Sequence, residues 1–250
     1  MTRLTLSEKA TYEWQLNLPG FGEEAQAKLR GCTALISRCG GLGGPLAYNL
    51  ASAGIGRLII AHGGVLHASD LNRQILMTHD HIGKPRIDSI VRRLREYSPQ
   101  VAIEGVGENI TEANVAALVG RVDLVFDCAP LFEERFLMNR ECVRQRKPMI
   151  EAAMFGMEGQ VTTIVPGQTP CLRCLYPETP TAWQRRFPVL GAVSALAGSI
   201  AAVEGIKLLT GLGTPLTGVL LYFDTTTMTF QRIPIQRRPD CPECDGHTVA

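Results

Sequence analysis

The sequence predicts an α/β protein with a Rossmann-like mixed sheet flanked by helices. Apolar strands alternate with helical patterns through the first 155 residues, and a glycine-rich turn follows the first of these strands. From about Gly156 the strands follow one another without intervening long helices, apart from one apolar helix. We therefore expect a parallel N-terminal half and antiparallel C-terminal strands in one domain of 250 residues.

Composition excludes several classes of protein. A net charge of +1 gives no reason to expect nucleic acid or an acidic membrane surface as a partner. The N-terminus shows no pattern typical of a signal peptide. The longest apolar run, Val189–Val203, contains two serines and ends at Glu204, so it predicts a buried helix and not a membrane span. We expect a cytoplasmic protein with no nucleic-acid and no membrane partner.

The N-terminal segment, 1–30, is predicted to be helical. An amphipathic helix spans about Ser7–Leu16, with Ser7 as its N-cap. A Pro-Gly-Phe-Gly turn at 19–22 then separates it from a second short helix that ends near Leu29.

The first strand, turn and helix form the pattern of a phosphate-binding site. Thr33–Ser37 is a buried strand, the turn covers 38–44, and a helix runs over about 44–53 before the next strand at 57–61. Bare backbone N–H groups and a helix N-terminus at such a turn favour an anion. A G-x-G-x-x-G frame would fall on positions 38, 40 and 43, but position 38 is arginine.

The end of the second strand lacks the acid that a dinucleotide site uses for ribose hydroxyls. The sequence there is Ala61-His62-Gly63-Gly64, and the next carboxylate is Asp70. A histidine can donate to one hydroxyl, whereas a carboxylate accepts from two. The alternative is a histidine at the strand end that faces solvent.

The remaining elements complete the sheet. Pro85 suits the start of a helix that runs to about Tyr97. Pro130 follows a strand, at the sheet edge where ligand groups usually lie. The expected strands are 101–106, 122–128, 149–153, 160–166, 219–223 and 229–235, and the further expected helices are 112–118, 132–146 and 189–210.

Two C-x-x-C pairs predict a structural zinc site. Four thiolates, Cys171, Cys174, Cys241 and Cys244, can form a closed tetrahedral shell. The alternative is a set of free buried thiols, and a redox pair is disfavoured because neither motif opens a helix after a strand. The other four cysteines are interpreted as core residues, except that Cys39 lies in the glycine turn.

Together these motifs resemble the MoeB/ThiF/HesA family, relatives of ubiquitin-activating enzymes. The resemblance covers nearly the whole chain and rests on the motifs at 40–43, 50–56, 69–74, 82–85, 156–161, 170–174 and 241–244. It implies one ThiF-type domain: N-terminal helices at 1–30, a nucleotide-binding half at 31–155, and antiparallel strands, zinc knuckles and a crossover segment at 156–250. It also implies MgATP at the glycine turn and adenylation of the C-terminal Gly-Gly of a small carrier protein or peptide. Members work as dimers, with an N-terminal arginine reaching across.

This sequence departs from the family pattern around the nucleotide. Arg38 replaces a glycine, His62 and Gly64 replace two acids, and Pro130 replaces the magnesium ligand. The family's phosphate-contacting lysine is Arg86 here, and its N-terminal arginine is Trp14. In the crossover segment, where some members carry a thiol, Gln184 is nearest in position. All of these replacements are read directly in the chain.

The candidate site residues follow from the resemblance. Arg73 and Arg86 are the candidate catalytic residues. The candidate nucleotide-binding residues are Arg38, Gly40, Gly41, Gly43, His62, Ser69, Asn72, Arg73, Gln74, Lys84 and Arg86. The guanidinium of Arg38 either fills the phosphate position, binds another anion bidentately, or faces solvent.

Three hypotheses for function remain open. The first is a family member that has lost or altered adenylation and acts as a divergent enzyme or a binding partner, as a homodimer or paired with an intact relative. The second is an active adenylyltransferase that uses substitutes such as Lys84, Arg86 and Asp127, with ATP and magnesium. The third is a nicotinamide or flavin oxidoreductase, which the missing ribose acid disfavours.

Overall fold

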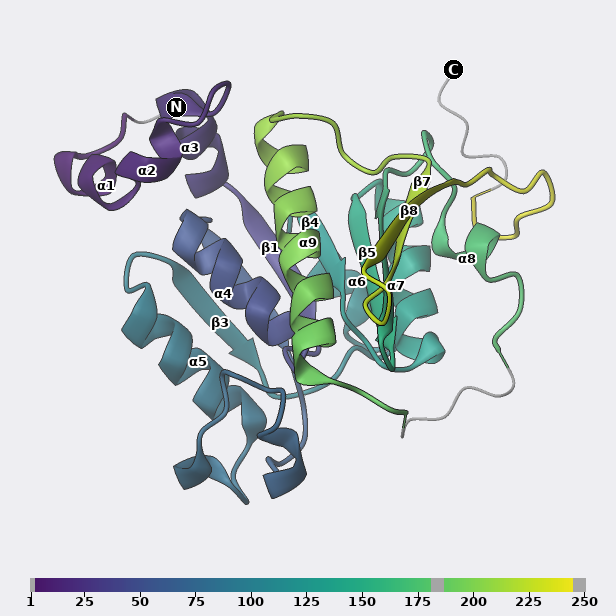
Figure 1. Ribbon diagram of the computed structural model, residues 1–250, viewed down its shortest axis with the longest axis horizontal. Helices are drawn as coiled ribbons and strands as arrows, with labels where there is room; N and C mark the ends of the chain where they lie inside the picture. Colours follow the sequence, from purple (N-terminus) through teal and green to yellow (C-terminus); the bar gives the residue numbers. More distant parts are fainter. Residues whose placement is uncertain (1–2, 181–186, 245–250) are drawn as a thin grey trace.

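One eight-stranded mixed sheet runs through the molecule (Figure 1). The computed structural model describes residues 3–180 and 187–244. The order of the strands is β3-β2-β1-β4-β5-β6-β7-β8. The first five pair in parallel, and β5 to β8 pair antiparallel, which confirms the mixed sheet expected from the sequence.

The strands lie close to their predicted positions. Their bounds are β1 Thr33–Ser37, β2 Arg57–Ala61, β3 Ala102–Val106, β4 Leu124–Asp127, β5 Met149–Phe155, β6 Glu158–Ile164, β7 Val219–Asp224 and β8 Thr229–Pro234. The prediction for β6 was shifted by two residues, because the tight turn at Gly156, with φ of 61°, brings the chain back immediately after β5.

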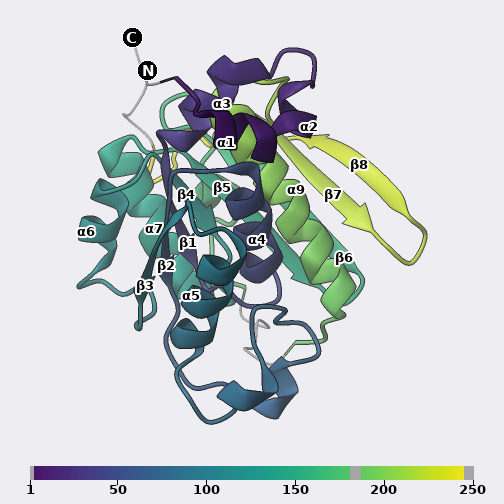
Figure 2. The ribbon, with the colours of Figure 1, turned by 90° about the vertical axis from the view of Figure 1, so that its left-hand side faces the viewer.

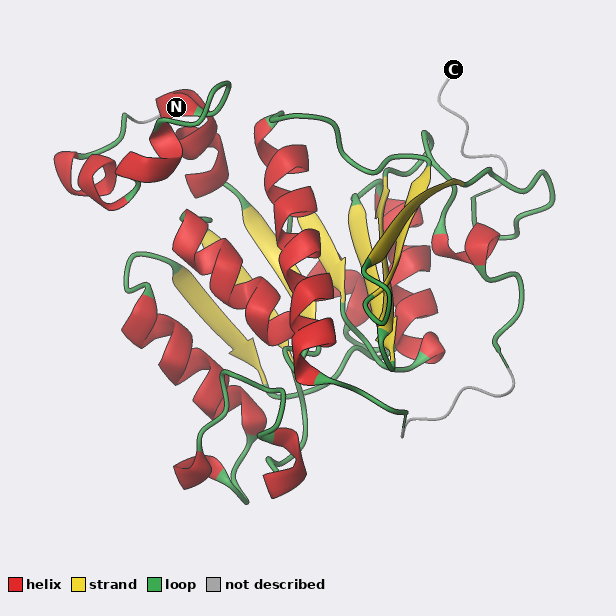
Figure 3. Ribbon diagram, in the orientation of Figure 1, coloured by secondary structure: helices red, strands yellow, loops and turns green. Residues whose placement is uncertain are grey.

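Helices cover both faces of the sheet (Figures 1 and 3). Side chains alternate along each parallel strand, so Ile36 packs on one face and Leu35 on the other. The longer helices are α3 Gly22–Arg30, α4 Gly43–Ala53, α5 Arg86–Tyr97, α7 Phe132–Gln145 and α9 Gly191–Thr210, with shorter helices α6 Val115–Gly120 and α8 Leu172–Leu175. The hydrophobic core on the Ile36 face of the sheet contains residues of α3, α4, α5 and α9. The core on the Leu35 face contains residues of α6, α7 and α8.

Helix α9 lies against the sheet beside α4. By length and composition alone it is apolar enough to cross a membrane, and 44% of its most apolar window is buried within the protein. Gly205 allows it to approach β4 closely, because a side chain there would collide with the ring of Phe126. Its packing agrees with the core helix predicted from the sequence.

The N-terminal helix differs from the prediction. It is broken into α1 Leu6–Thr11 and α2 Glu13–Leu16. The N-cap is Thr5 and not Ser7, because Thr5 and Glu8 form a reciprocal capping box. Figure 2 shows these helices at one end of the molecule, with the β7–β8 hairpin projecting to one side.

Candidate functional site

A cavity of about 790 Å³ opens at the carboxyl ends of β1, β2, β4 and β5. The chain leaves β1 toward β2 on one side and returns to β4 on the other, so the cavity lies at the switch point where open α/β sheets bind ligands. Its lining residues are Arg38, Gly40, Gly41, Leu42, His62, His67, Ser69, Asp70, Arg73, Gln74, Arg86, Cys128, Ala129, Pro130, Arg135, Ala152, Ala153, Met154, Phe187, Val189 and Ser194.

Arg38 sits in a backbone conformation that favours glycine. Its φ of 61° is left-handed, which costs a residue with a side chain roughly 1–2 kcal/mol. Its guanidinium does not face solvent. It forms a two-point ion pair with Glu134 on α7, in which Nε lies 2.8 Å from Oε2 and Nη2 donates to Oε1. The positive charge at the first turn position is therefore already compensated within the protein.

Asp70 joins the two candidate catalytic arginines. Its Oδ2 accepts from Arg86 Nη2 at 2.7 Å, and its Oδ1 lies 3.4 Å from Arg73 Nη2. Gln74 Nε2 and the His67 backbone N–H also donate to this carboxylate. Although burial acts in the opposite direction, the hydrogen bonds from Arg86 and His67 keep the pKa of Asp70 below its usual value.

Gly64 and Arg86 fit each other sterically. Gly64 has φ of 89°, and a Cβ atom there would lie 2.8 Å from Arg86 Nη1. The Arg86 backbone N–H also donates to the Gly64 carbonyl, at 3.0 Å. The guanidinium thus occupies the space into which an acidic side chain at position 64 would extend.

His62 is buried at the end of β2 and does not face solvent. Burial and the positive charges of Arg86 and Arg38 lower its pKa to about 3, against a hydrogen bond with the Cys39 backbone. The imidazole is therefore neutral near pH 7. Its Nδ1 atom is buried without a hydrogen-bond partner, and so is Oε1 of Gln74.

Arg135 lines the cavity and is the centre of a buried ionic cluster. Its Nε donates to Asp127 at 2.8 Å, and its Nη2 donates to Glu151. Burial raises the pKa of both carboxyl groups, while the charge of Arg135 opposes that rise. Asp127 is thus committed to Arg135 and to the Ala129 backbone N–H.

These residues do not fit a magnesium ion bound with ATP. Pro130 offers no side-chain oxygen at the position after β4. Among the described residues that line the cavity, Asp70 is the one carboxylic acid, and it already accepts from two arginines. Magnesium requires oxygen ligands in near-octahedral geometry.

The structure brings most of the candidate residues together. Arg38, Gly40, Gly41, His62, Ser69, Arg73, Gln74 and Arg86 line the cavity. Three do not: the Lys84 side chain is exposed, the Asn72 side chain accepts from Arg73 at 2.9 Å, and Gly43 packs against the Arg38 carbonyl. Gln184 lies outside the described residues.

Sequence reasoning missed Glu134 and Arg135. Both lie on α7, whose charged residues look like those of a solvent-facing helix, yet both are buried. The available signal was the position of α7 directly after β4, which directs its first turn toward the carboxyl edge of the sheet.

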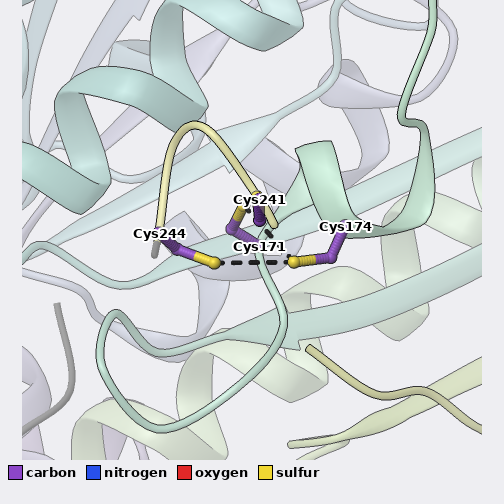
Figure 4. A group of neighbouring side chains, drawn as sticks. All are labelled: Cys171, Cys174, Cys241 and Cys244. Atoms are coloured by element: carbon purple, nitrogen blue, oxygen red, sulfur yellow. Dashed lines mark hydrogen bonds between the residues drawn. The ribbon is translucent and has the colours of Figure 1, made fainter. Parts of the chain in front are cut away.

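The four cysteines of the two C-x-x-C pairs converge in a buried cluster (Figure 4). All four Sγ atoms lie within 4.8 Å of one another, with Cys171–Cys241 at 3.6 Å and Cys174–Cys244 at 3.5 Å. A tetrahedral shell with Zn–S bonds of about 2.3 Å has S–S edges of about 3.8 Å. This arrangement could hold a metal ion. It joins α8 to the loop near the C-terminus, and the Arg238 backbone N–H points to Cys174 Sγ at 3.5 Å.

Comparison with known proteins gives consistent matches. The ThiF family model matches residues 12–243. The chain is 50% identical over 248 residues to protein HesA of Leptolyngbya boryana, covering 99% of this chain and 89% of that protein. It is 33% identical over 251 residues to the sulfur carrier protein adenylyltransferase of Thermus thermophilus, covering 97% and 93%. The crystal structure of E. coli MccB with ATP matches with a TM-score of 0.79 at 24% identity, over 88% of this chain and 68% of that one, which shows a shared fold.

Proposed function

This chain belongs to the ThiF family, and from that premise we propose that it has lost or altered the ATP-dependent adenylation of a carrier-protein C-terminus. It would act as a divergent enzyme or binding partner in a cofactor, sulfur-transfer or peptide-modifying pathway. The Thermus relative is named an adenylyltransferase of a sulfur carrier protein, so a small carrier protein or peptide that ends in Gly-Gly is the proposed partner.

The ion pair between Arg38 and Glu134 is the main support for this proposal. Catalysis of phosphoryl chemistry needs cations aimed at charge that develops on the phosphates. Here the guanidinium of Arg38, at the glycine turn, forms an ion pair with Glu134, and that of Arg86 forms an ion pair with Asp70. Pro130 offers no oxygen ligand for a metal, and in the described part of the cavity Arg38 and Arg86 are already paired with carboxylates.

Pyrophosphate exchange tests the proposal. Purified protein with MgATP and candidate Gly-Gly carriers should give no exchange above a no-enzyme control. A triple variant, Arg38→Gly, Glu134→Ala and Pro130→Asp, removes the ion pair at the turn without leaving an unpaired charge and supplies a carboxylate for the metal, and we expect it to bind MgATP more tightly than the natural chain. Robust exchange by the unmodified chain, abolished by Arg73→Ala, would instead support an active adenylyltransferase.

We further propose that the chain pairs with a second copy or with an intact relative. Trp14, which replaces the family's N-terminal arginine, is 90% exposed on α2. Light scattering of the purified chain separates the two cases: a monomer alone that becomes a dimer when an intact relative is added would support the heterodimer. A chain that stays monomeric with every relative tested would contradict both.

A further inference from the structure

The second cysteine pair, Cys241 and Cys244, lies in a segment without regular secondary structure. Strand β8 ends before this segment, and the described residues 235–244 form turns but no helix or strand. Both cysteines are nevertheless buried, and their sulfur atoms lie beside those of the first pair, Cys171 and Cys174, which is 70 residues earlier (Figure 4). Thiols are weak hydrogen-bonding groups, so other contacts are needed to hold the second pair against the first.

Arg237 connects the two pairs through its guanidinium. Nη2 donates to the backbone carbonyl of Cys244, and Nη1 donates to that of Gly167 at 3.4 Å. Gly167 lies in the turn between β6 and Cys171. One guanidinium therefore bonds both the second pair and the segment that leads into the first pair. Because its donors have fixed directions in one plane, a guanidinium can fix two acceptors relative to each other.

The first pair is held in place by other parts of the protein. Thr169 Oγ1 accepts from the Val165 backbone N–H at 2.9 Å and closes the turn that contains Gly167. At the start of α8, the Leu172 backbone N–H donates to Oδ1 of Asn139 on α7 at 2.8 Å. Asn139 is buried, as is Leu172. The first pair is thus a fixed base to which Arg237 attaches the second.

The neighbouring residue, Arg238, makes different contacts. Its backbone N–H is directed to Cys174 Sγ at 3.5 Å, whereas its guanidinium pairs with the exposed Asp240 at 2.8 Å. The positive charge of Arg238 also acts on the thiols of Cys174 and Cys241. Both arginines therefore bring charge to the cluster, but of the two guanidinium groups it is that of Arg237 that bonds both segments.

We propose that Arg237 is a positioning residue of the metal site. Its guanidinium holds the backbone of the second pair against the turn before the first pair, and the four sulfur atoms are thereby kept at the spacing of a tetrahedral shell. Replacing groups that orient metal ligands from outside the shell typically costs about 10–100-fold in metal affinity. The inference concerns the cysteine cluster and is independent of the proposed loss of adenylation.

Competition for zinc tests the proposal. The full chain and its variants are loaded with zinc and titrated with the chromophoric chelator pyridylazoresorcinol. Arg237→Gln should lower the zinc affinity by at least about tenfold. Arg238→Gln is the matched control: it removes the same charge and keeps the backbone N–H, so it should change the affinity by less than about threefold, because salt screens a charge at the surface. Arg237→Lys keeps the charge without the planar donors and should recover only a minor part of the loss.

Two further measurements separate positioning from a general contribution to stability. Cobalt(II) bound in place of zinc has absorption bands that report the geometry of its ligands, and Arg237→Gln should alter these bands whereas Arg238→Gln should not. Urea unfolding of Arg237→Gln should show a larger loss of stability with zinc than with chelator, because weaker metal binding destabilises only the metal-loaded protein.

Several outcomes would overturn the inference. These are a purified chain that binds neither zinc nor cobalt, an unchanged zinc affinity in Arg237→Gln, or equal losses of affinity in Arg237→Gln and Arg238→Gln, which would assign the effect to charge. Full recovery by Arg237→Lys, or equal losses of stability with zinc and with chelator, would also contradict it. None of these measurements depends on pyrophosphate exchange, so the proposed function stands or falls separately.

Discussion

The ion pair between Arg38 and Glu134 predicts a strong energetic coupling across the cavity. Both side chains are largely buried, at 11% and 8% exposure, so each needs the other to remain charged inside the protein. Removing one partner of a buried pair typically costs about 3–5 kcal/mol. Because this pair borders the cavity, we expect about 2–4 kcal/mol for Glu134→Ala.

Arg38→Gly should cost less than Glu134→Ala. It also strands a buried charge, but it relieves a left-handed conformation worth about 1 kcal/mol. The net cost is then about 1–3 kcal/mol. The double variant removes both charges and the strain, so it should lose at most about 1–2 kcal/mol, well below the sum of the single variants.

Urea unfolding of the four proteins measures this coupling, and thermal melting checks it. For a chain of this size, 1 kcal/mol shifts the melting temperature by about 2–4 °C. Glu134→Ala should therefore melt about 4–16 °C lower. The surface pair Lys9–Glu23, 2.7 Å apart with 41% and 54% of the side chains accessible, is the control and should show no measurable coupling. Strictly additive losses for Arg38 and Glu134 would refute the reasoning.

Three further predictions concern the metal site, Gly64 and His62. Elemental analysis should find one zinc ion per chain. Cys241→Ser should release the zinc and lower the melting temperature by at least about 5 °C. A zinc-free protein of unchanged stability would contradict a structural zinc site. Gly64→Ala should destabilise by about 1–3 kcal/mol through its left-handed φ and the displacement of Arg86. Gly218→Ala, with φ of 69° and no atom within 4 Å, reports the strain alone and should cost less. Burial lowers the pKa of His62 from 6.5 to about 3 in the folded protein. Between these pH values the unfolded chain binds a proton on His62 that the folded chain does not, so the free energy of unfolding falls as the pH falls from 6.5 toward 3. His62→Asn should remove about 2 kcal/mol of that loss between pH 6.5 and 5, and an unchanged pH profile of urea unfolding would show that His62 titrates normally.

The sequence by itself determined the sheet and the cysteine cluster. Strand periodicity, the glycine turn after β1 and the two C-x-x-C pairs are local patterns, and each specifies its own backbone geometry or ligand chemistry. The N-cap of the first helix could also have been predicted locally, because Thr5 is followed three residues later by Glu8, as a capping box requires, whereas Ser7 is followed by Ala10.

Only the tertiary structure decided which charged residues of the cavity are paired and which polar groups are buried. Arg38 and Glu134 are 96 residues apart in the chain, and Asp70 and Arg86 are 16 apart, so no local pattern pairs these charges. The sequence shows that an arginine is present but not which carboxylate, if any, pairs with it. Packing places a carboxylate against each of Arg38, Arg73, Arg86 and Arg135, buries His62 and leaves its Nδ1 without a partner. Charge compensation and desolvation depend on three-dimensional proximity, and for that reason they were decided by the fold.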